Sequence, residues 1–395
     1  MKVVLLTNIL SPYRKVFYDK LFACFREKGV EFVALVMAET EPNRPWHYSE
    51  YKGDYCELLN SKTRIAKNIY FHFNNNLQKR LQEIRPDIVI ASGSYISPSV
   101  LKVIRLKNKL NYKLLFWSES HLNELRSYGY LKLKIRELIR NMIYKRFDGF
   151  WYAGIKSKEF IEKYADKNIK AKKKKKYYFI PNLVDHNFYY ESSKANILEK
   201  AKIKADLNIP IQSYVFILPA RLEVEKGILP FFKLFNACYC KNKATIIILG
   251  DGKLRSDIEQ YGNENQLDIK LMGYVKQEDI QRFYSIADCF LLPSLSDPNP
   301  LSCIEALWSG LPLLLTTHVG NYPETIKIGQ NGYVINYDDS KEAISIIDNL
   351  ISSDEDWKAS AKNISLAIAE EIYEPDKAVR QLVNSMVTDY GNKYQ

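Results

Sequence analysis

Short apolar runs alternate with longer amphipathic stretches along the whole chain. Such runs, each bounded by polar residues or glycine, are typical of strands buried in a parallel sheet. The stretches between them have the spacing of helices that cover a sheet with one face. The expected strands are residues 2–7, 31–37, 87–91, 113–117 and 149–152 in the first half, and 214–219, 244–249, 269–272, 289–292, 311–316 and 333–335 in the second.

This alternation of strands and helices predicts an α/β fold with two doubly wound, Rossmann-like parallel sheets. The 395 residues are enough for two domains with full cores. We place the first domain at residues 1–182 and the second at 183–375, and assign the C-terminal segment 376–395 to the first. A cleft between two such domains is the expected place for a ligand.

The composition fits a globular protein, with 46% hydrophobic and 26% charged residues. The N-terminus becomes polar at Thr7, too early for a secretory signal, and no run of about 18 uncharged apolar residues is present. A cytoplasmic location without a membrane span is therefore expected. The six cysteines have neither metal-site nor disulfide spacing, which predicts reduced thiols.

Charge is distributed unevenly between the two halves. Residues 1–182 hold 36 lysines and arginines against 17 acidic residues, whereas residues 183–395 hold 21 against 29. A basic half of this kind favours a partner with an anionic surface. Nucleic acid is not expected to be that partner, since no stacking or groove-reading module accompanies the charge.

The helix expected at 130–146 combines lysine and arginine with leucine and isoleucine, and a run of lysines follows at 170–176. An amphipathic basic helix of this kind is typical of a membrane surface, where each cation contributes about 1 kcal/mol at an anionic leaflet. We therefore expect a peripheral location on the inner face of the cytoplasmic membrane. The alternative is that the helix packs on its own sheet and the lysines are only solvated.

Residues 287–312 carry the most specific signal in the chain. A buried strand is followed by a loop with three prolines and then by a helix, for which Asn299 is the expected N-cap and Pro300 the first residue. Asp297 in the loop and Glu305 in the helix accept hydrogen bonds as the diol of a sugar requires, while the helix N–H groups suit an anion. The alternative is that Asp297 caps the loop and that Glu305 is a solvated helix residue.

Arg221 and Lys226 follow the expected strand 214–219, where a second helix begins. Arginine offers a planar fork for a diphosphate, and lysine a mobile point charge. The pair therefore predicts a site for the phosphates of a nucleotide. The alternative is a solvated basic loop.

These segments resemble the donor signature of retaining GT-B glycosyltransferases of family 4. Glu305 matches the second of two glutamates separated by seven residues, and Asp297 stands where the first is usual. The resemblance implies that Arg221 and Lys226 neutralise the leaving nucleoside diphosphate without a metal ion or other cofactor. It also implies two domains facing across a cleft, with the last helix crossing back to the first domain.

The same resemblance assigns further roles. The segment with Tyr274 and Val275 corresponds to the part that holds the nucleobase. Gly250, in a tight turn common in the family, and the backbone of Asn299, Leu301 and Ser302 correspond to parts that bind the donor. The segment 272–275 suits uracil or guanine, and a UDP-sugar is favoured over a GDP-sugar.

In the first domain, Asn8 to Arg14 resembles the Ser-Pro-Tyr-Arg form of some bacterial polysaccharide glycosyltransferases. Arg14, Tyr13 and Trp46 are expected at the acceptor. His121 and Glu119, which follow the strand 113–117, are expected at the sugar, the phosphate or the acceptor.

The sequence therefore predicts a retaining hexosyltransferase that uses a nucleoside diphosphate sugar and a glycan or polyprenyl-linked acceptor, in synthesis of a capsule, an O-antigen or an exopolysaccharide. Two alternatives remain open at this level. One is a nucleoside-diphosphate-sugar epimerase or hydrolase on the same fold. The other is a catalytically silent binding subunit.

Overall fold

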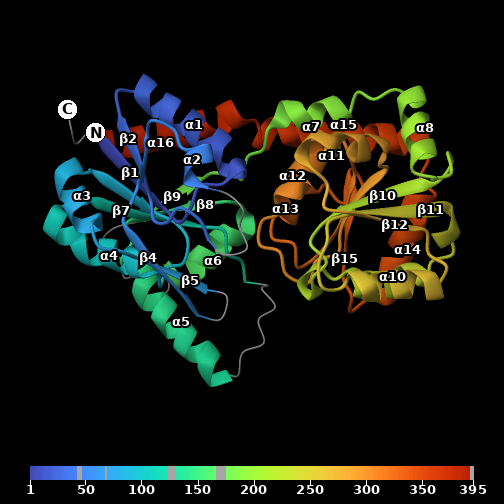
Figure 1. The fold of residues 1–395 in the computed structure, drawn as a ribbon, viewed down its shortest axis with the longest axis horizontal. Helices are drawn as coiled ribbons and strands as arrows, with labels where there is room; N and C mark the ends of the chain where they lie inside the picture. The colour runs from blue at the N-terminus through green and yellow to red at the C-terminus, as the bar shows by residue number, and fades with distance from the viewer. Residues whose placement is uncertain (42–46, 67–68, 123–129, 166–174, 392–395) are drawn as a thin grey trace. The chain divides into compact units, whose positions relative to one another are not determined.

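The computed structural model describes residues 1–41, 47–66, 69–122, 130–165 and 175–391. The chain forms two compact units, which are described separately (Figure 1). The first unit contains residues 1–119, 126–183 and 375–395, and the second contains residues 120–125 and 184–374.

The first unit is built on a seven-stranded parallel sheet in the order β3-β2-β1-β6-β7-β8-β9. The strands are β1 (Lys2–Thr7), β2 (Glu31–Val36), β3 (Cys56–Leu58), β6 (Ile88–Ala91), β7 (Lys113–Ser118), β8 (Gly149–Tyr152) and β9 (Lys176–Phe179). The helices are α1 (Pro12–Glu27), α2 (Tyr48–Tyr51), α3 (Leu77–Ile84), α4 (Pro98–Leu110), α5 (Tyr130–Tyr144), α6 (Ile155–Ala165) and α16 (Pro375–Tyr390).

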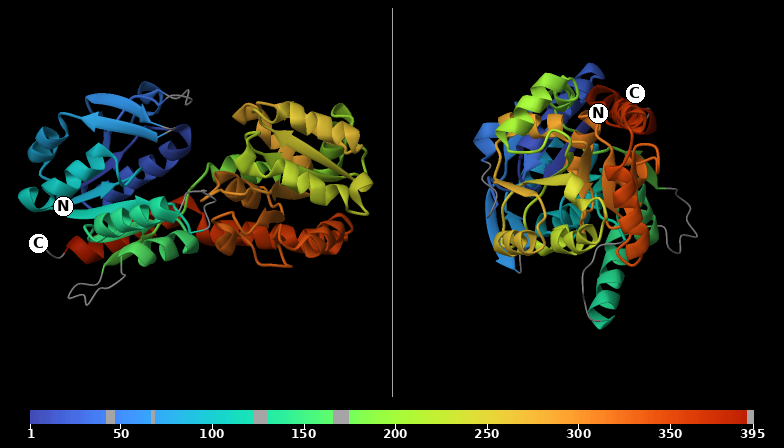
Figure 2. Two further views of the ribbon diagram at one scale, coloured as in Figure 1. Left: turned by 90° about the horizontal axis from the view of Figure 1, so that it is seen from below. Right: turned by 90° about the vertical axis from the view of Figure 1, so that its right-hand side faces the viewer.

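Two apolar cores cover the two faces of this sheet. Alternate residues of each strand point to opposite faces, so Trp151 enters one core and Phe150 the other. The last helix, α16, runs along the first unit (Figure 2) and packs on α1. It buries Leu382, Val383 and Met386 in the core that contains Trp151. The expected return of the C-terminal helix to the first domain is confirmed.

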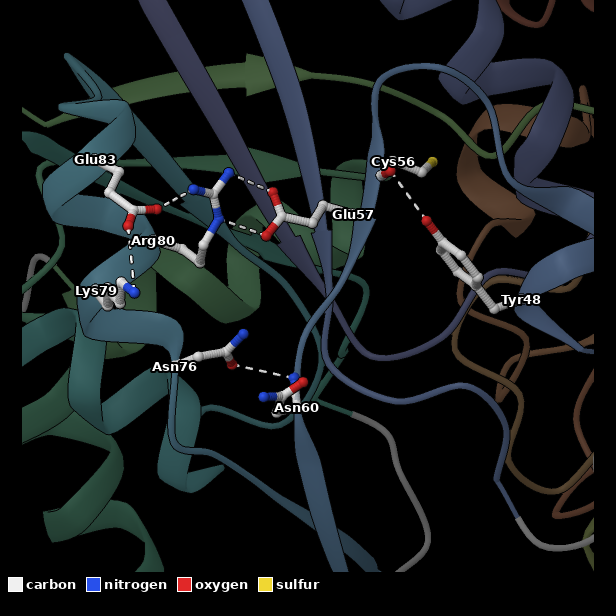
Figure 3. Close-up of polar contacts among 8 residues, drawn as sticks. All are labelled: Tyr48, Cys56, Glu57, Asn60, Asn76, Lys79, Arg80 and Glu83. Carbon is white, nitrogen blue, oxygen red and sulfur yellow. Dashed lines mark hydrogen bonds and ion pairs between the residues drawn. The ribbon is translucent and has the colours of Figure 1, made fainter.

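Between β2 and β6 the sequence analysis missed α3, the edge strand β3 and an antiparallel hairpin, β4 (Ser61–Ala66) with β5 (Ile69–Asn74). Figure 3 shows how α3 is fixed to the sheet edge. The Arg80 guanidinium donates to both Glu57 carboxylate oxygens, at 2.5 and 2.6 Å, and it also pairs with Glu83. The Asn76 side chain accepts a hydrogen bond from the Asn60 N–H at 3.1 Å. A two-pronged arginine pair therefore anchors the polar face of α3, whose Leu77, Leu81 and Ile84 are buried in the core on its other face.

The second unit is built on a six-stranded parallel sheet in the order β12-β11-β10-β13-β14-β15. The strands are β10 (Tyr214–Pro219), β11 (Ala244–Leu249), β12 (Ile269–Gly273), β13 (Cys289–Leu292), β14 (Leu313–Thr316) and β15 (Gly332–Ile335). The helices are α7 (His186–Ser192), α8 (Ile197–Asp206), α9 (Ile228–Asn236), α10 (Arg255–Glu264), α11 (Gln277–Ile286), α12 (Leu301–Trp308), α13 (Tyr322–Thr325), α14 (Ser340–Ile351) and α15 (Glu355–Ile372), with short 3₁₀ turns η1 (Val224–Lys226) and η2 (Lys241–Lys243).

Both sheets are doubly wound, as the sequence predicts, and each has one point where the strand order reverses. It lies between β1 and β6 in the first unit and between β10 and β13 in the second. Ligands of open α/β sheets bind outside the carboxyl ends of the strands at such a point. The loops that follow these four strands are therefore the places to look for a site.

All six cysteines are free thiols, as their spacing predicts. Within the described ranges, no helix has both the length and the apolar character needed to cross a membrane.

Candidate functional site

The loop after β10 carries Arg221 on its outside. The Arg221 side chain is 74% exposed and lies 3.8 Å from the Glu225 carboxylate. The loop is joined to the loop after β11, because the Leu222 N–H donates to the Asp251 carbonyl at 3.0 Å. Gly250 permits this approach, since a Cβ atom there would lie 2.0 Å from the Ala220 carbonyl oxygen. An exposed cation is thus presented at the carboxyl end of β10 by a loop whose backbone is hydrogen-bonded to the loop after β11.

Lys226 reaches from the same loop to the segment that follows β13. Its ammonium lies 2.5 Å from the Asp297 carboxylate, and both side chains are largely buried. Backbone bonds hold the two segments together, since the Glu225 carbonyl accepts from the N–H groups of Leu295, at 2.8 Å, and Ser296, at 3.3 Å. The predicted site residues Lys226 and Asp297 therefore meet at the point where the strand order reverses.

Gly227 and Tyr337 hold the loop that carries Lys226 against the segment that follows β13. Gly227 has φ +65°, and a Cβ atom there would lie 2.1 Å from the Pro293 carbonyl oxygen. The Tyr337 hydroxyl lies 2.8 Å from that oxygen and 3.2 Å from the Gly227 carbonyl oxygen. The sequence analysis missed Tyr337, which has no motif around it and is far from both loops in the chain.

The helix α12 starts at Leu301, and Pro300, not Asn299, is its N-cap. The expectation for Asn299 and Pro300 was wrong by one position, because Pro300 has extended backbone angles, φ −67° and ψ 127°. Pro300 has no side-chain donor or acceptor with which to cap the first turn, and backbone N–H groups at a helix N-terminus suit an anion. The Asn321 side chain donates to the Pro300 carbonyl at 3.0 Å and fixes the start of the helix.

Glu305 lies one turn into α12 and is only 8% exposed. The Tyr284 hydroxyl donates to its carboxylate at 3.0 Å, and Tyr189 also hydrogen-bonds to it. Burial raises the pKa of the Glu305 carboxyl, against the opposing effect of these two hydrogen bonds. Glu305 is therefore not a solvated helix residue, and it is held in one place by two tyrosines that the sequence analysis missed.

The raised pKa of Glu305 predicts a pH-dependent stability. The folded protein binds a proton at this carboxyl more tightly than the unfolded chain, for which the pKa is 4.5, so stability falls as the pH rises from 4.5 through the raised pKa. Glu305→Gln has no proton to lose. We expect its melting temperature to decline less than that of the wild type between pH 4 and pH 8, as measured by scanning calorimetry.

The exposed Glu278→Gln on α11 is the control and should follow the wild type. Parallel melting curves for Glu305→Gln and the wild type across this range would contradict the prediction.

Tyr274 follows β12 and is almost fully exposed, while Val275 is partly buried against the core. The turn before them is tied to the loop after β11, since the Gly250 N–H donates to the Gly273 carbonyl at 2.8 Å. Gly273 has φ +68°, which favours glycine. The structure thus leaves the Tyr274 ring free of the core, as a stacking surface for a base requires.

In the first unit, Arg14 lies in the first turn of α1 and not in the preceding loop, because α1 already starts at Pro12. Its guanidinium pairs with Glu119 and lies 4.1 Å from the centre of the Trp117 ring. The neighbouring Tyr18 hydroxyl lies 3.2 Å from the Thr7 hydroxyl. The structure therefore brings together Arg14 and Glu119, and it adds Trp117 and Tyr18, which the sequence analysis missed.

His121 follows β7 and is almost fully buried. Trp46 lies outside the described residues, as does most of the lysine run at 170–176, and the side chain of Tyr13 is not described. Within the described part of the chain, no group of three or more histidine, cysteine, aspartate or glutamate side chains is arranged to hold a metal ion.

The second unit matches a known family. Residues 199–365 match the model of the family described as glycosyl transferases group 1. The second unit contains a glycosyl transferases group 1 domain. This group 1 domain includes Arg221, Lys226, Asp297 and Glu305.

Curated relatives match a longer part of the chain. An uncharacterized glycosyltransferase of Methanocaldococcus jannaschii is 29% identical over 69% of this chain and 66% of its own length. The alpha-monoglucosyldiacylglycerol synthase of Acholeplasma laidlawii is 26% identical over 54% of this chain and 54% of its own length. The matched region thus spans between about half and two thirds of these relatives.

Solved structures match nearly the whole chain. Anabaena HepE, solved in complex with UDP and glucose, has a TM-score of 0.70 over 98% of this chain and 100% of its own, at 16% sequence identity. At this identity the similarity shows the fold. The fold is of the GT-B type, as the sequence analysis predicts.

Proposed function

We propose that the protein is a retaining glycosyltransferase that moves a hexosyl group from a nucleoside diphosphate sugar, with UDP favoured as the nucleotide, to an acceptor hydroxyl. The observation that carries this proposal is the meeting of Lys226 with Asp297 in the loop that leads into α12, inside the group 1 domain. The glycosyltransferase names of the relatives support it. So does HepE, whose structure contains UDP and glucose.

In the proposed reaction, the chain mainly stabilises charge and positions the reactants. Arg221, Lys226 and the N–H groups of α12 would receive the charge that develops on the leaving diphosphate. Asp297, held by Lys226, would accept a sugar hydroxyl, and Glu305, held by two tyrosines, would accept ribose hydroxyls. In this proposal no carboxylate acts as a nucleophile. The leaving diphosphate itself would help to deprotonate the acceptor hydroxyl, which attacks on the face of the sugar that the diphosphate leaves. Two cations and the N-terminus of a helix would then supply the positive charge that a metal ion supplies to the diphosphate in other enzymes.

Calorimetry with a panel of nucleoside diphosphates and their sugars, in the absence of metal, tests the donor proposal. We expect one diphosphate to bind tightly, with a stoichiometry of about one per protein chain. If none of the panel binds, the donor site is wrong, and the silent-subunit alternative gains support. If a donor sugar is converted without any acceptor, the epimerase or hydrolase alternative gains support.

We also propose that the acceptor is a lipid-linked or surface glycan, which the protein meets as a peripheral protein at the inner face of the cytoplasmic membrane. Support comes from α5, which extends away from the sheet of its unit (Figure 1). Its C-terminal part is anchored, since Tyr144 is buried and the Arg140 guanidinium lies 4.7 Å from the ring centres of both Phe160 and Tyr164. The rest of α5 lies outside the core, with several apolar side chains exposed.

The outer side of α5 carries an apolar stripe at positions that share one face of a helix. The stripe comprises Leu131, Ile135, Leu138 and Met142, which are between 50% and 74% exposed. Lys132, Lys134 and Arg136 lie on the same helix, and its single acid, Glu137, is 3.7 Å from Lys163. Apolar side chains between cations fit an anionic lipid surface, in which the stripe enters the headgroup region.

We expect the quadruple variant Leu131→Ser/Ile135→Ser/Leu138→Ser/Met142→Ser to lose at least tenfold in binding to vesicles that contain phosphatidylglycerol, because four exposed apolar side chains can no longer enter the lipid. Flotation at low salt measures this. The control Ile197→Ser/Leu198→Ser removes two even more exposed apolar side chains from α8 and should bind as the wild type does.

Equal flotation of the quadruple variant would contradict the membrane proposal. A second result would also contradict it: a wild type that sediments as a dimer and a quadruple variant that sediments as a monomer. In that case a second copy of the chain would cover the stripe.

A further inference from the structure

A pocket of about 360 Å³ lies at the amino end of β10, whereas the candidate donor site lies at the carboxyl end of the same strand. It is lined by residues of α8, of the start of β10 and of α15. β10 runs from Tyr214, in the pocket, to Pro219, just before Arg221, and at about 3.3 Å per residue the two strand ends are roughly 16 Å apart. The pocket and the donor site therefore share no residue and no loop.

The lining of this pocket is electropositive. Lys200, Lys204, Lys243 and Lys358 line it, together with two acids, Asp288 and Glu355. When all six side chains are ionised, the net charge is +2. Both acids already have donors, since Asp288 accepts from the Val215 N–H at 2.8 Å and Glu355 lies 2.7 Å from the Lys358 ammonium. The positive charge of the pocket is thus not cancelled by its own residues.

Lys204 is the cation held most firmly. Its ammonium donates to the carbonyl oxygens of Ile211, at 3.1 Å, and Ser213, at 2.9 Å, so one of its three N–H groups remains for a further acceptor. Burial lowers the pKa of Lys204, and the charges of Lys200 and Lys358 lower it further, whereas Asp288 and Glu355 oppose the change. Three ammonium groups therefore act on one another across this space, and an anion between them would relieve that repulsion.

The rest of the lining combines the polar side chains of Gln212 and Ser213 with apolar ones. Ile286, Ile351 and the Tyr214 ring line the pocket, and the Lys358 ammonium lies 5.6 Å from the centre of that ring. Ile197 and Ile211 add two strongly exposed apolar side chains to its lining. A ligand with a doubly charged group at one end and an apolar or planar group at the other would satisfy both parts of the lining. The volume is within the usual range for small-molecule sites.

We infer that this pocket binds a small phosphate monoester with an apolar or planar organic group. The dianion of such an ester balances the net charge of +2, and its organic group covers the isoleucine and tyrosine walls. This site goes beyond the proposed glycosyl transfer and does not depend on it.

Phenyl phosphate is the probe, and calorimetry is the measurement. Because the candidate donor site also offers cations, the titration is carried out in the wild type, in Lys200→Gln/Lys358→Gln, and in Arg221→Gln/Lys226→Gln. We expect at least a tenfold rise in Kd for the pocket variant and an unchanged Kd for the donor-site variant. Lys202→Gln, an exposed lysine of α8 outside the pocket, is the matched control and should bind as the wild type does.

Three outcomes would overturn the inference. They are no binding of phenyl phosphate, binding that Lys200→Gln/Lys358→Gln leaves intact, and binding of phenol as tight as that of phenyl phosphate. Loss of binding in Arg221→Gln/Lys226→Gln alone would assign the probe to the donor site, which overturns the pocket and supports the proposed function. Phosphatidate vesicles that bind the wild type more tightly than the pocket variant would identify the ester as a lipid headgroup.

Discussion

Lys226→Gln is expected to reduce kcat for glycosyl transfer by about 10²–10³-fold, the effect of removing one preorganised group that stabilises developing charge. The Lys226 ammonium lies 2.5 Å from Asp297 and, in the proposed site, beside the leaving diphosphate. Calorimetry gives the affinity for the diphosphate, and steady-state kinetics with the donor that the panel identifies gives kcat. Lys233→Gln, an exposed lysine on α9, is the control and should leave both unchanged.

A double variant separates the two roles that Lys226 can have. In Lys226→Gln/Asp297→Asn, two neutral amides replace the ion pair and can hydrogen-bond to each other. If Lys226 only braced the loop, this pair would recover much of the activity lost in Lys226→Gln. We expect no recovery, since the positive charge itself acts on the diphosphate, and a recovery would contradict the proposed role.

Gly227→Ala is expected to impair both stability and transfer. The left-handed φ of +65° costs roughly 1–2 kcal/mol for any residue with a Cβ atom. In addition, the new Cβ atom would lie 2.1 Å from the Pro293 carbonyl oxygen, so the loop that holds Lys226 must move away from β13. A displacement of about 1 Å at a catalytic group costs about a hundredfold in rate, which kinetics and thermal unfolding will measure.

Gly329→Ala is the matched control for this substitution. Gly329 has φ +78° and no atom within 4 Å of an added Cβ, so the control keeps the backbone cost and lacks the clash. We expect Gly329→Ala to lower the melting temperature moderately and to leave transfer intact. Equal effects of the two substitutions would show that contact with Pro293 does not matter.

Much of the fold was predictable because strands buried on both faces are continuous apolar runs. β11, Ala-Thr-Ile-Ile-Ile-Leu, is an example, and its predicted bounds match the structure. The hairpin β4–β5 was missed because Ser61–Ala66 is mostly polar, and β3 because three edge residues carry little pattern. Arg80 stabilises that region through Glu57, a contact between residues that are 23 positions apart.

The sequence predicted individual residues of the candidate site but not the contacts between them. The sequence places Lys226 and Asp297 after two different strands, but their pairing depends on β10 and β13 being neighbours, which local patterns do not specify. Tyr337 was missed since nothing distinguishes it among 28 tyrosines until the fold brings it to Gly227. The cap at Asn299 was wrong because a proline next to a helix fits the N-cap as well as the first turn.

The position of α16 has a consequence for synthesis of the protein. Residues 375–390 complete a core whose other members come from the first 183 residues, whereas the second unit is nearly continuous in sequence. A ribosome that adds roughly 5–20 residues per second needs about 10–40 s to pass from the end of the first unit's main segment to α16. Throughout that time, the apolar face that α16 covers has no partner helix, so the half that is translated first is the half whose core is completed last.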